Sequence, residues 1–276
     1  MSLFMYLLYV IPRRLLSRIV GKLMHLKLPF RLNRLTVKLF ADFYNINVDE
    51  AEYPIGYYSS IGDFFVRRLK PEARPVSEAM LVHPADAKIS QAAMIESGEL
   101  IQAKNKTYSL RSFLGADDYV NSLKNPFFIT YYLCPTDYHR VHCPADARVL
   151  SVHYLPGDLW PVNEWSTTRI ESLFSVNERV VIELEIASKK AFAVLVGATN
   201  VGKMTLAFDS DLITNQGRRG SPVFKTYEDV FLKKNDELGC FHMGSTVVMV
   251  YDESFLGDLS KLKSTSSRVG AALFSE

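Results

Sequence analysis

The alternation of apolar and polar residues is clearest in the run Val180-Val181-Ile182-Glu183-Leu184-Glu185-Ile186. Successive side chains of a strand point to opposite faces, so this run predicts a strand with one face in the core. Residues 127–133, 191–196 and 246–251 are also rich in Val, Ile, Phe and Tyr, and turn residues bound them. Few long helical periods separate these runs, which favours antiparallel pairing. We therefore expect an α+β protein with an antiparallel β-sandwich or a partly closed barrel as its core, preceded by amphipathic N-terminal helices.

Composition excludes several classes of function. The chain has 276 residues, of which 48% are hydrophobic, enough to bury a full core. Its 32 basic and 30 acidic residues leave a net charge of +2, so no basic field favours a nucleic-acid partner. Cys134, Cys143 and Cys240 form an odd set without C-x-x-C spacing. This argues against a disulfide framework and a four-thiolate zinc site, and it suits a reducing cytosolic setting.

The N-terminal end of the chain is basic and amphipathic. Residues 1–50 carry eight Lys and Arg residues against three Asp and Glu residues. Leu15, Leu16, Ile19, Val20, Leu23 and Met24 recur at helical spacing, while Arg14, Arg18 and Lys22 fall four apart on the other side. Such a helix suits an anionic membrane surface. The alternative is that its apolar stripe packs against the protein's own core.

The apolar opening, residues 3–11, is well short of the roughly 20 residues that a spanning helix needs. Its charges follow the apolar run, whereas a signal peptide places them before it. We therefore expect a peripheral protein on the cytoplasmic face of the cell membrane. The basic pattern ends near residues 53–56, so we divide the chain into a membrane-associating helical region, 1–55, and a catalytic β-rich domain, 56–276. Residues 60–69 predict a short capped helix.

Two further features have a structural and a functional interpretation. Gly197 and Gly202 favour bends or bulges within strands, with a ligand contact as the alternative. Arg218 and Arg219 favour a solvated loop, with a lipid phosphate as the alternative.

Three short segments, residues 83–86, 137–142 and 243–246, each place a reactive side chain beside a turn. They supply Asp86, His139, His142 and Ser245. A serine hydroxyl is a poor nucleophile at neutral pH, and it needs an imidazole to take its proton and a carboxylate to orient that imidazole. Two histidines beside Cys143 also fit a metal site. Because no H-E-x-x-H motif and no third ligand at zinc spacing accompany them, we expect no metal.

The sequence around Ser245 is not that of a common serine hydrolase. Ser245 opens an apolar strand in Met243-Gly244-Ser245-Thr246, without a G-x-S-x-G elbow. Gly244 has no Cβ, so its carbonyl is open to attack and its backbone can adopt unusual angles. A self-cleaving bond requires this geometry.

Together these segments resemble the phosphatidylserine decarboxylases of bacterial type, from about residue 61 to residue 251. The resemblance rests on Phe64-Phe65-Val66-Arg67-Arg68-Leu69, Pro84-Ala85-Asp86, Asp137-Tyr138-His139-Arg140-Val141-His142, Pro156-Gly157-Asp158-Leu159, Asn177-Glu178-Arg179, Val196-Gly197-Ala198-Thr199 and Gly244-Ser245-Thr246, in this order. The chain departs from the family pattern at Met243, where Leu is common, and at Ala87, where Gly is common. Neither departure removes a reactive group.

The resemblance implies a self-cleaving enzyme. In the family, the serine attacks the carbonyl of the preceding glycine, the resulting ester eliminates to dehydroalanine, and hydrolysis leaves a pyruvoyl group. This covalent cofactor forms a Schiff base with phosphatidylserine and takes up the electrons released with carbon dioxide, so that phosphatidylethanolamine is formed. Here, cleavage between Gly244 and Ser245 would give a large chain, 1–244, and a small pyruvoyl chain, 245–276.

The motif match also implies individual roles. Ser245 becomes the pyruvoyl group, His142 is the base for self-cleavage, Asp86 orients His142, and His139 donates a proton to the carbanion. The implied partners are phosphatidylserine, an anionic membrane surface and the two chains of one precursor, with homo-oligomer formation left open. The competing hypotheses are an uncut Ser/His/Asp lipid-ester hydrolase and a catalytically silent, membrane-docked binding module.

Overall fold

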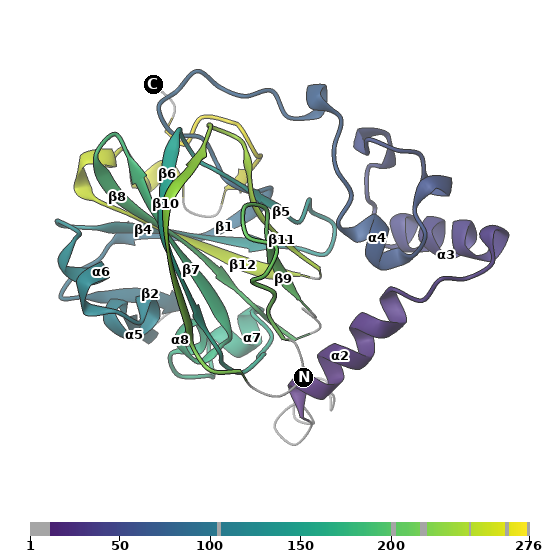
Figure 1. Ribbon diagram of the computed structural model, residues 1–276, viewed down its shortest axis with the longest axis horizontal. Helices are drawn as coiled ribbons and strands as arrows, with labels where there is room; N and C mark the ends of the chain where they lie inside the picture. Colours follow the sequence, from purple (N-terminus) through teal and green to yellow (C-terminus); the bar gives the residue numbers. More distant parts are fainter. Residues whose placement is uncertain are drawn as a thin grey trace.

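The computed structural model describes residues 12–103, 106–199, 203–215, 220–242, 244–262 and 265–274 (Figure 1). The helices are α2 (Arg13–Met24), α3 (Phe30–Phe43), α4 (Ile61–Phe65), α5 (Leu110–Leu114), α6 (Asp117–Asn121), α7 (Glu164–Thr167) and α8 (Leu173–Val176). The strands are β1 (Ala87–Met94), β2 (Glu99–Ala103), β3 (Lys106–Ser109), β4 (Phe127–Leu133), β5 (Arg140–His142), β6 (Ala147–Leu155), β7 (Arg179–Ile186), β8 (Lys189–Val196), β9 (Met204–Leu206), β10 (Val223–Leu232), β11 (Glu237–Phe241), β12 (Ser245–Tyr251) and β13 (Ser266–Ser267).

One large antiparallel sheet organises the protein. Its eight strands follow the order β10-β6-β7-β8-β12-β4-β1-β13, and smaller sheets contain β5-β11-β9 and β2-β3. Among the described strands, β10 and β13 form the two edges without pairing to each other, so the barrel is not closed. The expected antiparallel α+β fold is confirmed. The four predicted strands correspond to β4, β7, β8 and β12.

Both faces of the large sheet are buried at its central strands, which explains the sequence patterns of these strands. On β12, Val247 and Met249 belong to one apolar cluster, whereas Val248 and Val250 belong to the cluster on the opposite face. A strand buried on both faces reads as a continuous apolar run. Strand β7 alternates instead, because Glu183 and Glu185 on its second face are only partly buried.

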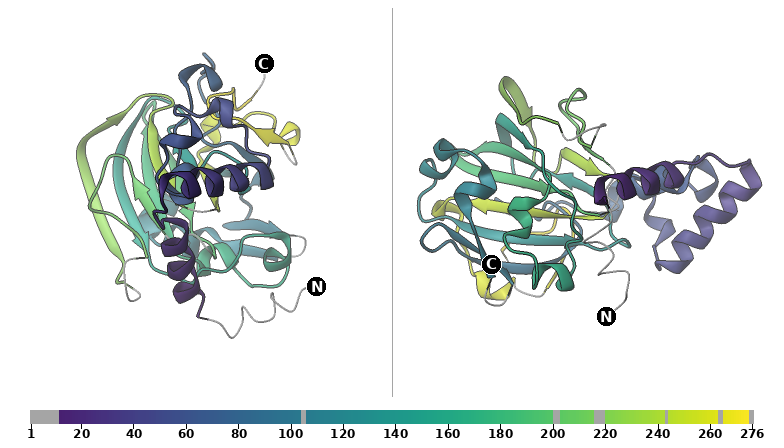
Figure 2. Two further views of the ribbon diagram at one scale, coloured as in Figure 1. Left: turned by 90° about the vertical axis from the view of Figure 1, so that its right-hand side faces the viewer. Right: turned by 90° about the horizontal axis from the view of Figure 1, so that it is seen from below.

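The N-terminal helices form an arm that projects from one side of the β structure (Figure 2). Val37 and Ala41 of α3 pack with Phe64 of α4 in a small separate core. The predicted helix over residues 60–69 exists, with Ser60 Oγ accepting the Asp63 N–H at 3.0 Å, but it ends at Phe65. The chain leaves the helix there because Leu69 bridges to Ala51 in extended structure.

The apolar residues of α2 and α3 face outward. The exposed set, which we call the apolar arm surface, is Leu15, Ile19, Leu23, Leu26, Phe30, Leu32, Leu35, Leu39 and Phe43. The buried positions of the same helices are instead Ser17, Asn33, Val37 and Ala41. The alternative in which the apolar stripe packs against the protein's own core therefore holds in part: Leu16 of α2 packs against the cluster that contains Val248 and Val250, whereas Leu15, Ile19 and Leu23 are exposed. No helix among the described residues has the length and apolar character needed to cross a membrane.

The structural interpretation of Gly197 is supported. A Cβ at this position would lie 3.3 Å from the Glu178 carbonyl oxygen and 3.1 Å from a Leu159 methyl carbon, so glycine permits a close backbone approach. Gly202, Arg218 and Arg219 lie outside the described residues, as does the apolar opening at residues 3–11.

Candidate active site

Ser245 begins the central strand β12. It pairs with Leu133 of β4, whereas pairing with β8 begins one residue later, between Thr246 and Val196. The Ser245 side chain is buried, and its Oγ has no hydrogen-bond partner. The Gly244–Ser245 bond therefore lies where the strand is free of the ladder on the β8 side.

His139 is the histidine closest to this bond. Its Nδ1 lies 2.8 Å from the Asp137 carbonyl oxygen, which can only accept, so Nδ1 carries the hydrogen and Nε2 has the free lone pair. That Nε2 is buried without a partner. A Cβ added to Gly244 would lie 3.9 Å from it. The ring packs against Phe65 at 4.0 Å between centroids, and burial lowers the pKa of His139 to about 3, which keeps the imidazole neutral.

His142 lies in a different environment. Its Nδ1 donates to the Asn235 carbonyl oxygen at 2.6 Å, and its Nε2 accepts the Tyr138 hydroxyl at 3.0 Å. Burial lowers the pKa of His142 as well. Both ring nitrogens are thus engaged, and neither of these bonds is to Ser245.

Asp86 binds an arginine and the C-terminal tail. Arg74 donates to the Asp86 carboxylate through Nε at 2.9 Å and through Nη2 at 2.5 Å, and it also binds Glu50 at 2.9 Å. The second Asp86 oxygen accepts the Val269 N–H at 2.8 Å. A guanidinium fork is a strong partner for a carboxylate. The structure therefore places His139 beside Gly244, the residue before Ser245, but it does not join Asp86, His142 and Ser245 in one hydrogen-bonded line, and the roles implied for them stay predictions.

A cavity of about 180 Å³ opens at Ser245. It is lined by Phe40, Tyr44, Phe65, Tyr132, Leu133, Pro135, Pro161, Val162, Asn163, Ala198, Thr199, Gly244 and Ser245. Helix α3 thus contributes aromatic walls, although it belongs to the region expected to bind the membrane. A larger, more polar cavity of about 600 Å³ shares Tyr132, Val162 and Asn163 with it and is also lined by Lys88 and Thr246.

Several of these residues were not predicted from the sequence. Phe65 and Tyr138 belong to family motifs, and this was a usable signal. Arg74 and Asn163 lie in segments without a motif or a regular period, and no signal singled them out.

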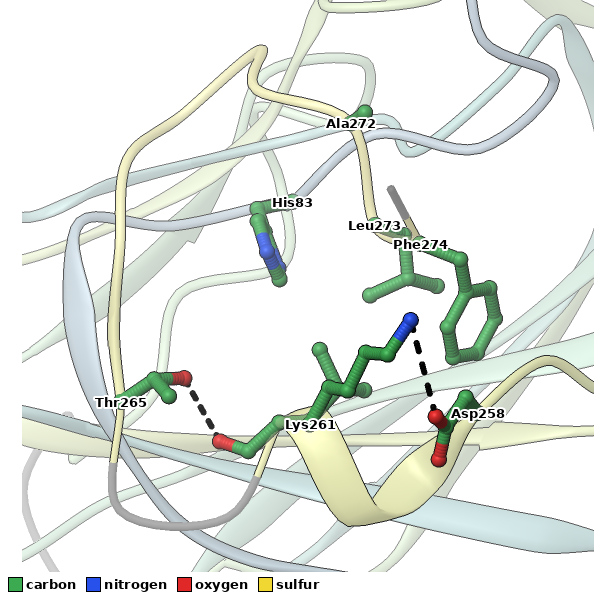
Figure 3. A pocket seen from close by; sticks show the side chains of 8 residues that line it. His83, Asp258, Lys261, Thr265, Ala272, Leu273 and Phe274 are labelled. Atoms are coloured by element: carbon green, nitrogen blue, oxygen red, sulfur yellow. Dashed lines mark hydrogen bonds and ion pairs between the residues drawn. The ribbon is translucent and has the colours of Figure 1, made fainter. Parts of the chain in front are cut away.

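Another cavity, of about 240 Å³, lies beside His83 (Figure 3). None of Asp86, His139, His142 and Ser245 lines it. The Nδ1 of His83 contacts the Tyr131 hydroxyl at 3.1 Å, and the cation of Lys261 lies 3.7 Å from Asp258. His83, Lys261 and Asp258 thus each have at least one polar partner at this cavity. Within the described part of the chain, no group of three or more His, Cys, Asp or Glu residues could hold a metal ion.

Comparison with known proteins agrees with these observations. Residues 61–274 match the family model described as phosphatidylserine decarboxylase. A phosphatidylserine decarboxylase proenzyme of Methylobacillus flagellatus is 41% identical over 89% of this chain and 88% of its own length. The proenzymes of Myxococcus xanthus and Vibrio parahaemolyticus are 36% and 40% identical, over 90% and 88% of this chain and 89% and 87% of their own lengths. The site is thus that of a carboxy-lyase. The chain belongs to the phosphatidylserine decarboxylase family.

The buried histidines predict a steep loss of stability in acid. Burial lowers the pKa of His83 to about 4, of His139 to about 3 and of His242 to about 4. An unfolded histidine has a pKa near 6.5, so between about pH 6.5 and 4 the unfolded chain binds up to about three more protons at these positions. The free energy of unfolding should fall by up to about 4 kcal/mol per pH unit there. Urea unfolding at several pH values, on a Ser245→Ala background, measures this slope.

His83→Gln is the matched control for this prediction. Because it removes one titrating group, it should reduce the slope by at most about 1.4 kcal/mol per pH unit. An unchanged slope would show that His83 is protonated in the folded protein.

Proposed function

We propose that this chain cuts itself between Gly244 and Ser245 and then decarboxylates phosphatidylserine to phosphatidylethanolamine. Membership of a family whose relatives are named proenzymes supports both steps. The observation that carries the proposal is the buried Ser245 Oγ, which has no hydrogen-bond partner. Ser245 directly follows Gly244, and Gly244 lies beside the free Nε2 of His139.

The surroundings of residue 245 fit a pyruvoyl group. The Ser245 side chain holds no hydrogen bond that would be lost on its conversion, and the residue lines the cavity at the start of β12. The pyruvoyl group supplies a ketone that accepts the substrate amine and the electron pair released with carbon dioxide. Binding and proton transfer are left to the side chains around it.

We assign proton donation after decarboxylation to His139. Its position beside Gly244 is the one that a donor to a substrate on residue 245 requires. Burial keeps this histidine neutral, but the phosphate and carboxylate of an entering head group would favour its charged form. The proton therefore arrives together with the substrate.

We keep His142 and Asp86 as the groups that activate Ser245 for self-cleavage. A histidine with a pKa of about 3 is a weak general base, which argues against His139 in this step while no anion is bound. The assignment requires His142 to exchange its bond with Tyr138 for one with Ser245 before cleavage.

Ser245→Ala should remain a single chain without activity, because the hydroxyl is both the attacking group and the precursor of the ketone. Intact-mass measurement should show residues 1–244 and 245–276 for the unmodified protein and one species for the variant. An unmodified protein that stays uncut but hydrolyses lipid esters would favour the lipid-ester hydrolase instead. An uncut, inactive one would favour the silent binding module.

His139→Ala should cut itself normally but turn over phosphatidylserine about 10² to 10⁴ fold more slowly, since general acid catalysis typically contributes that much. Chain cleavage on a gel, borohydride trapping of the ketone and carbon dioxide release in detergent micelles are measured on one preparation. The companion variant His142→Ala should stay largely uncut. If His139→Ala is the uncut protein, His139 is the base and the division of labour is reversed.

We also propose that the apolar arm surface docks on an anionic bilayer at the cytoplasmic face, so that residues 1–55 form the membrane-associating region. Leu39 and Phe43 are exposed on α3, while Phe40 and Tyr44 of the same helix line the cavity at Ser245. A lipid leaving the bilayer along α3 would thus meet the cavity directly. Exposed apolar area of this extent is unusual on a protein surrounded only by water.

Leu35→Ser combined with Leu39→Ser should weaken vesicle binding by more than tenfold, because burying one leucine contributes about 1.5–3 kcal/mol. Flotation with phosphatidylserine-containing vesicles measures the binding, and self-cleavage should be unchanged. Phe231→Ser, at a side chain that is equally exposed but lies on β10, is the control and should float normally. Unimpaired flotation of the double variant would place the anchor elsewhere.

A further inference from the structure

The first two arginines of α2 turn toward the catalytic domain. Arg13 donates to both carboxylate oxygens of Asp158, through Nε at 2.9 Å and Nη2 at 2.5 Å. Its guanidinium carbon also lies 3.7 Å from the centre of the Trp160 ring. The side chains of Arg13 and Asp158 are only 14% and 30% exposed. Arg13 is therefore bound to the catalytic domain.

Arg14 makes a second connection. Its Nε donates to the Gly157 carbonyl oxygen at 2.9 Å, and its Nη2 lies 3.4 Å from Glu178 Oε1. The Glu178 side chain is 1% exposed. It also accepts hydrogen bonds from the Tyr154 hydroxyl and from the backbone N–H of Asn215. Arg14 thus supplies positive charge to a carboxylate that has almost no access to water.

The segments bound by the two arginines form one rigid junction, residues 157–160 with 176–178. Asp158 N–H donates to the Val176 carbonyl at 2.9 Å, and Glu178 N–H returns a bond to the Asp158 carbonyl at 2.8 Å. The Asn177 side chain bonds both the N–H and the carbonyl of Trp160, each at 2.9 Å. Gly157 is required here, because a Cβ would lie 2.4 Å from the Val176 carbonyl oxygen.

This junction leads directly into the substrate cavity. Pro161, Val162 and Asn163 follow Trp160 in the chain and line the cavity that holds Ser245. The Thr199 hydroxyl, from another wall of the same cavity, donates to the Leu159 carbonyl at 2.5 Å. A displacement of residues 157–160 would therefore move one wall of the cavity and loosen its contact with another.

We propose that Arg13 and Arg14 are positioning residues for decarboxylation, which hold the cavity wall at residues 161–163 through the junction. The proposal rests on the decarboxylase function proposed above. A surface arginine contributes to membrane binding as a hydrated charge, but Arg13 forms a forked ion pair and stacks on an indole, both of which fix a geometry. Helix α2 is then a strut between the bilayer and the substrate cavity.

The test uses Arg13→Ala and a soluble short-chain phosphatidylserine kept below its critical micelle concentration, so that no bilayer takes part. Because even a small misplacement of a positioning group can cost up to about 10² fold in rate, we expect kcat/KM to fall by about tenfold or more. Self-cleavage should be normal, since a Cβ at Gly244 would meet Leu133 and His139 but no atom of residues 161–163 within 4 Å. Lys22→Ala removes the same charge from an exposed position on α2 and should turn over the soluble substrate normally.

Two further variants identify the contact itself. Asp158→Ala should have at least the effect of Arg13→Ala, because it also removes the acceptor of the Leu159 N–H. The double variant should be no worse than Asp158→Ala alone, since the contact with Arg13 is already lost there. Arg13→Lys, which keeps the charge but not the fork, should lie between Arg13→Ala and the unmodified protein.

Three results would overturn the proposal. The first is normal turnover of the soluble substrate by Arg13→Ala. The second is that the effects of Arg13→Ala and Asp158→Ala multiply in the double variant. The third is loss of self-cleavage in both Arg13→Ala and Arg13→Lys, which would indicate a general folding defect. An unmodified protein that is cut but does not release carbon dioxide would instead disprove the proposed decarboxylase function.

Discussion

The hydrogen bonding of β12 between β4 and β8 is the constraint on which the site depends. Because pairing with β8 begins at Thr246, the bond before Ser245 can be cut without breaking any cross-strand bond of the rest of the strand. Both faces of β12 are buried, so a chain end made by the proposed cleavage would stay where the sheet holds it. Farther along the chain, Ser267 pairs with β1 and donates to the Ala85 carbonyl at 2.8 Å. The sheet thus fixes the position of Ser245, and in the proposed reaction other groups must come to it.

The sequence was sufficient for four strands of the large sheet, β4, β7, β8 and β12, because the burial of a strand determines the local period of its apolar residues. Strand β7 alternates where one face is partly wet, and β12 is continuously apolar where both faces are dry. The closure of the barrel was not predictable, since it depends on whether two edge strands far apart in the sequence meet. Motif order was likewise enough to nominate Ser245 and His139, and the structure places His139 beside Gly244, the residue before Ser245.

The relation between the two histidines and Asp86 could not be derived in the same way. His142 belongs to β5 and His139 directly precedes this strand. Residues an odd number apart in extended chain point to opposite faces, which accounts for His139 facing Gly244 while His142 turns to Tyr138 and Asn235. The Asp86–Arg74 pair joins two irregular segments, and no periodicity in the sequence predicts such a contact. For α2, the sequence predicted an amphipathic helix but not which residues turn toward the catalytic domain. The carboxylates of Asp158 and Glu178 in that domain decide this.

Burial links the two reactions proposed for this site. A fully buried imidazole next to Phe65 is neutral at physiological pH, so without a nearby anion His139 offers neither a proton nor a strong base. An anionic head group changes this balance, because a negative charge in a space of low dielectric constant favours the imidazolium strongly. In the proposed mechanism, proton donation then depends on substrate occupancy, because the lipid that forms the carbanion also charges its donor. Phe65 is then part of this acid–base chemistry, since it lines the cavity and packs against His139. A wetter site would leave His139 with a pKa closer to its ordinary value, and its charge would no longer depend on the bound lipid.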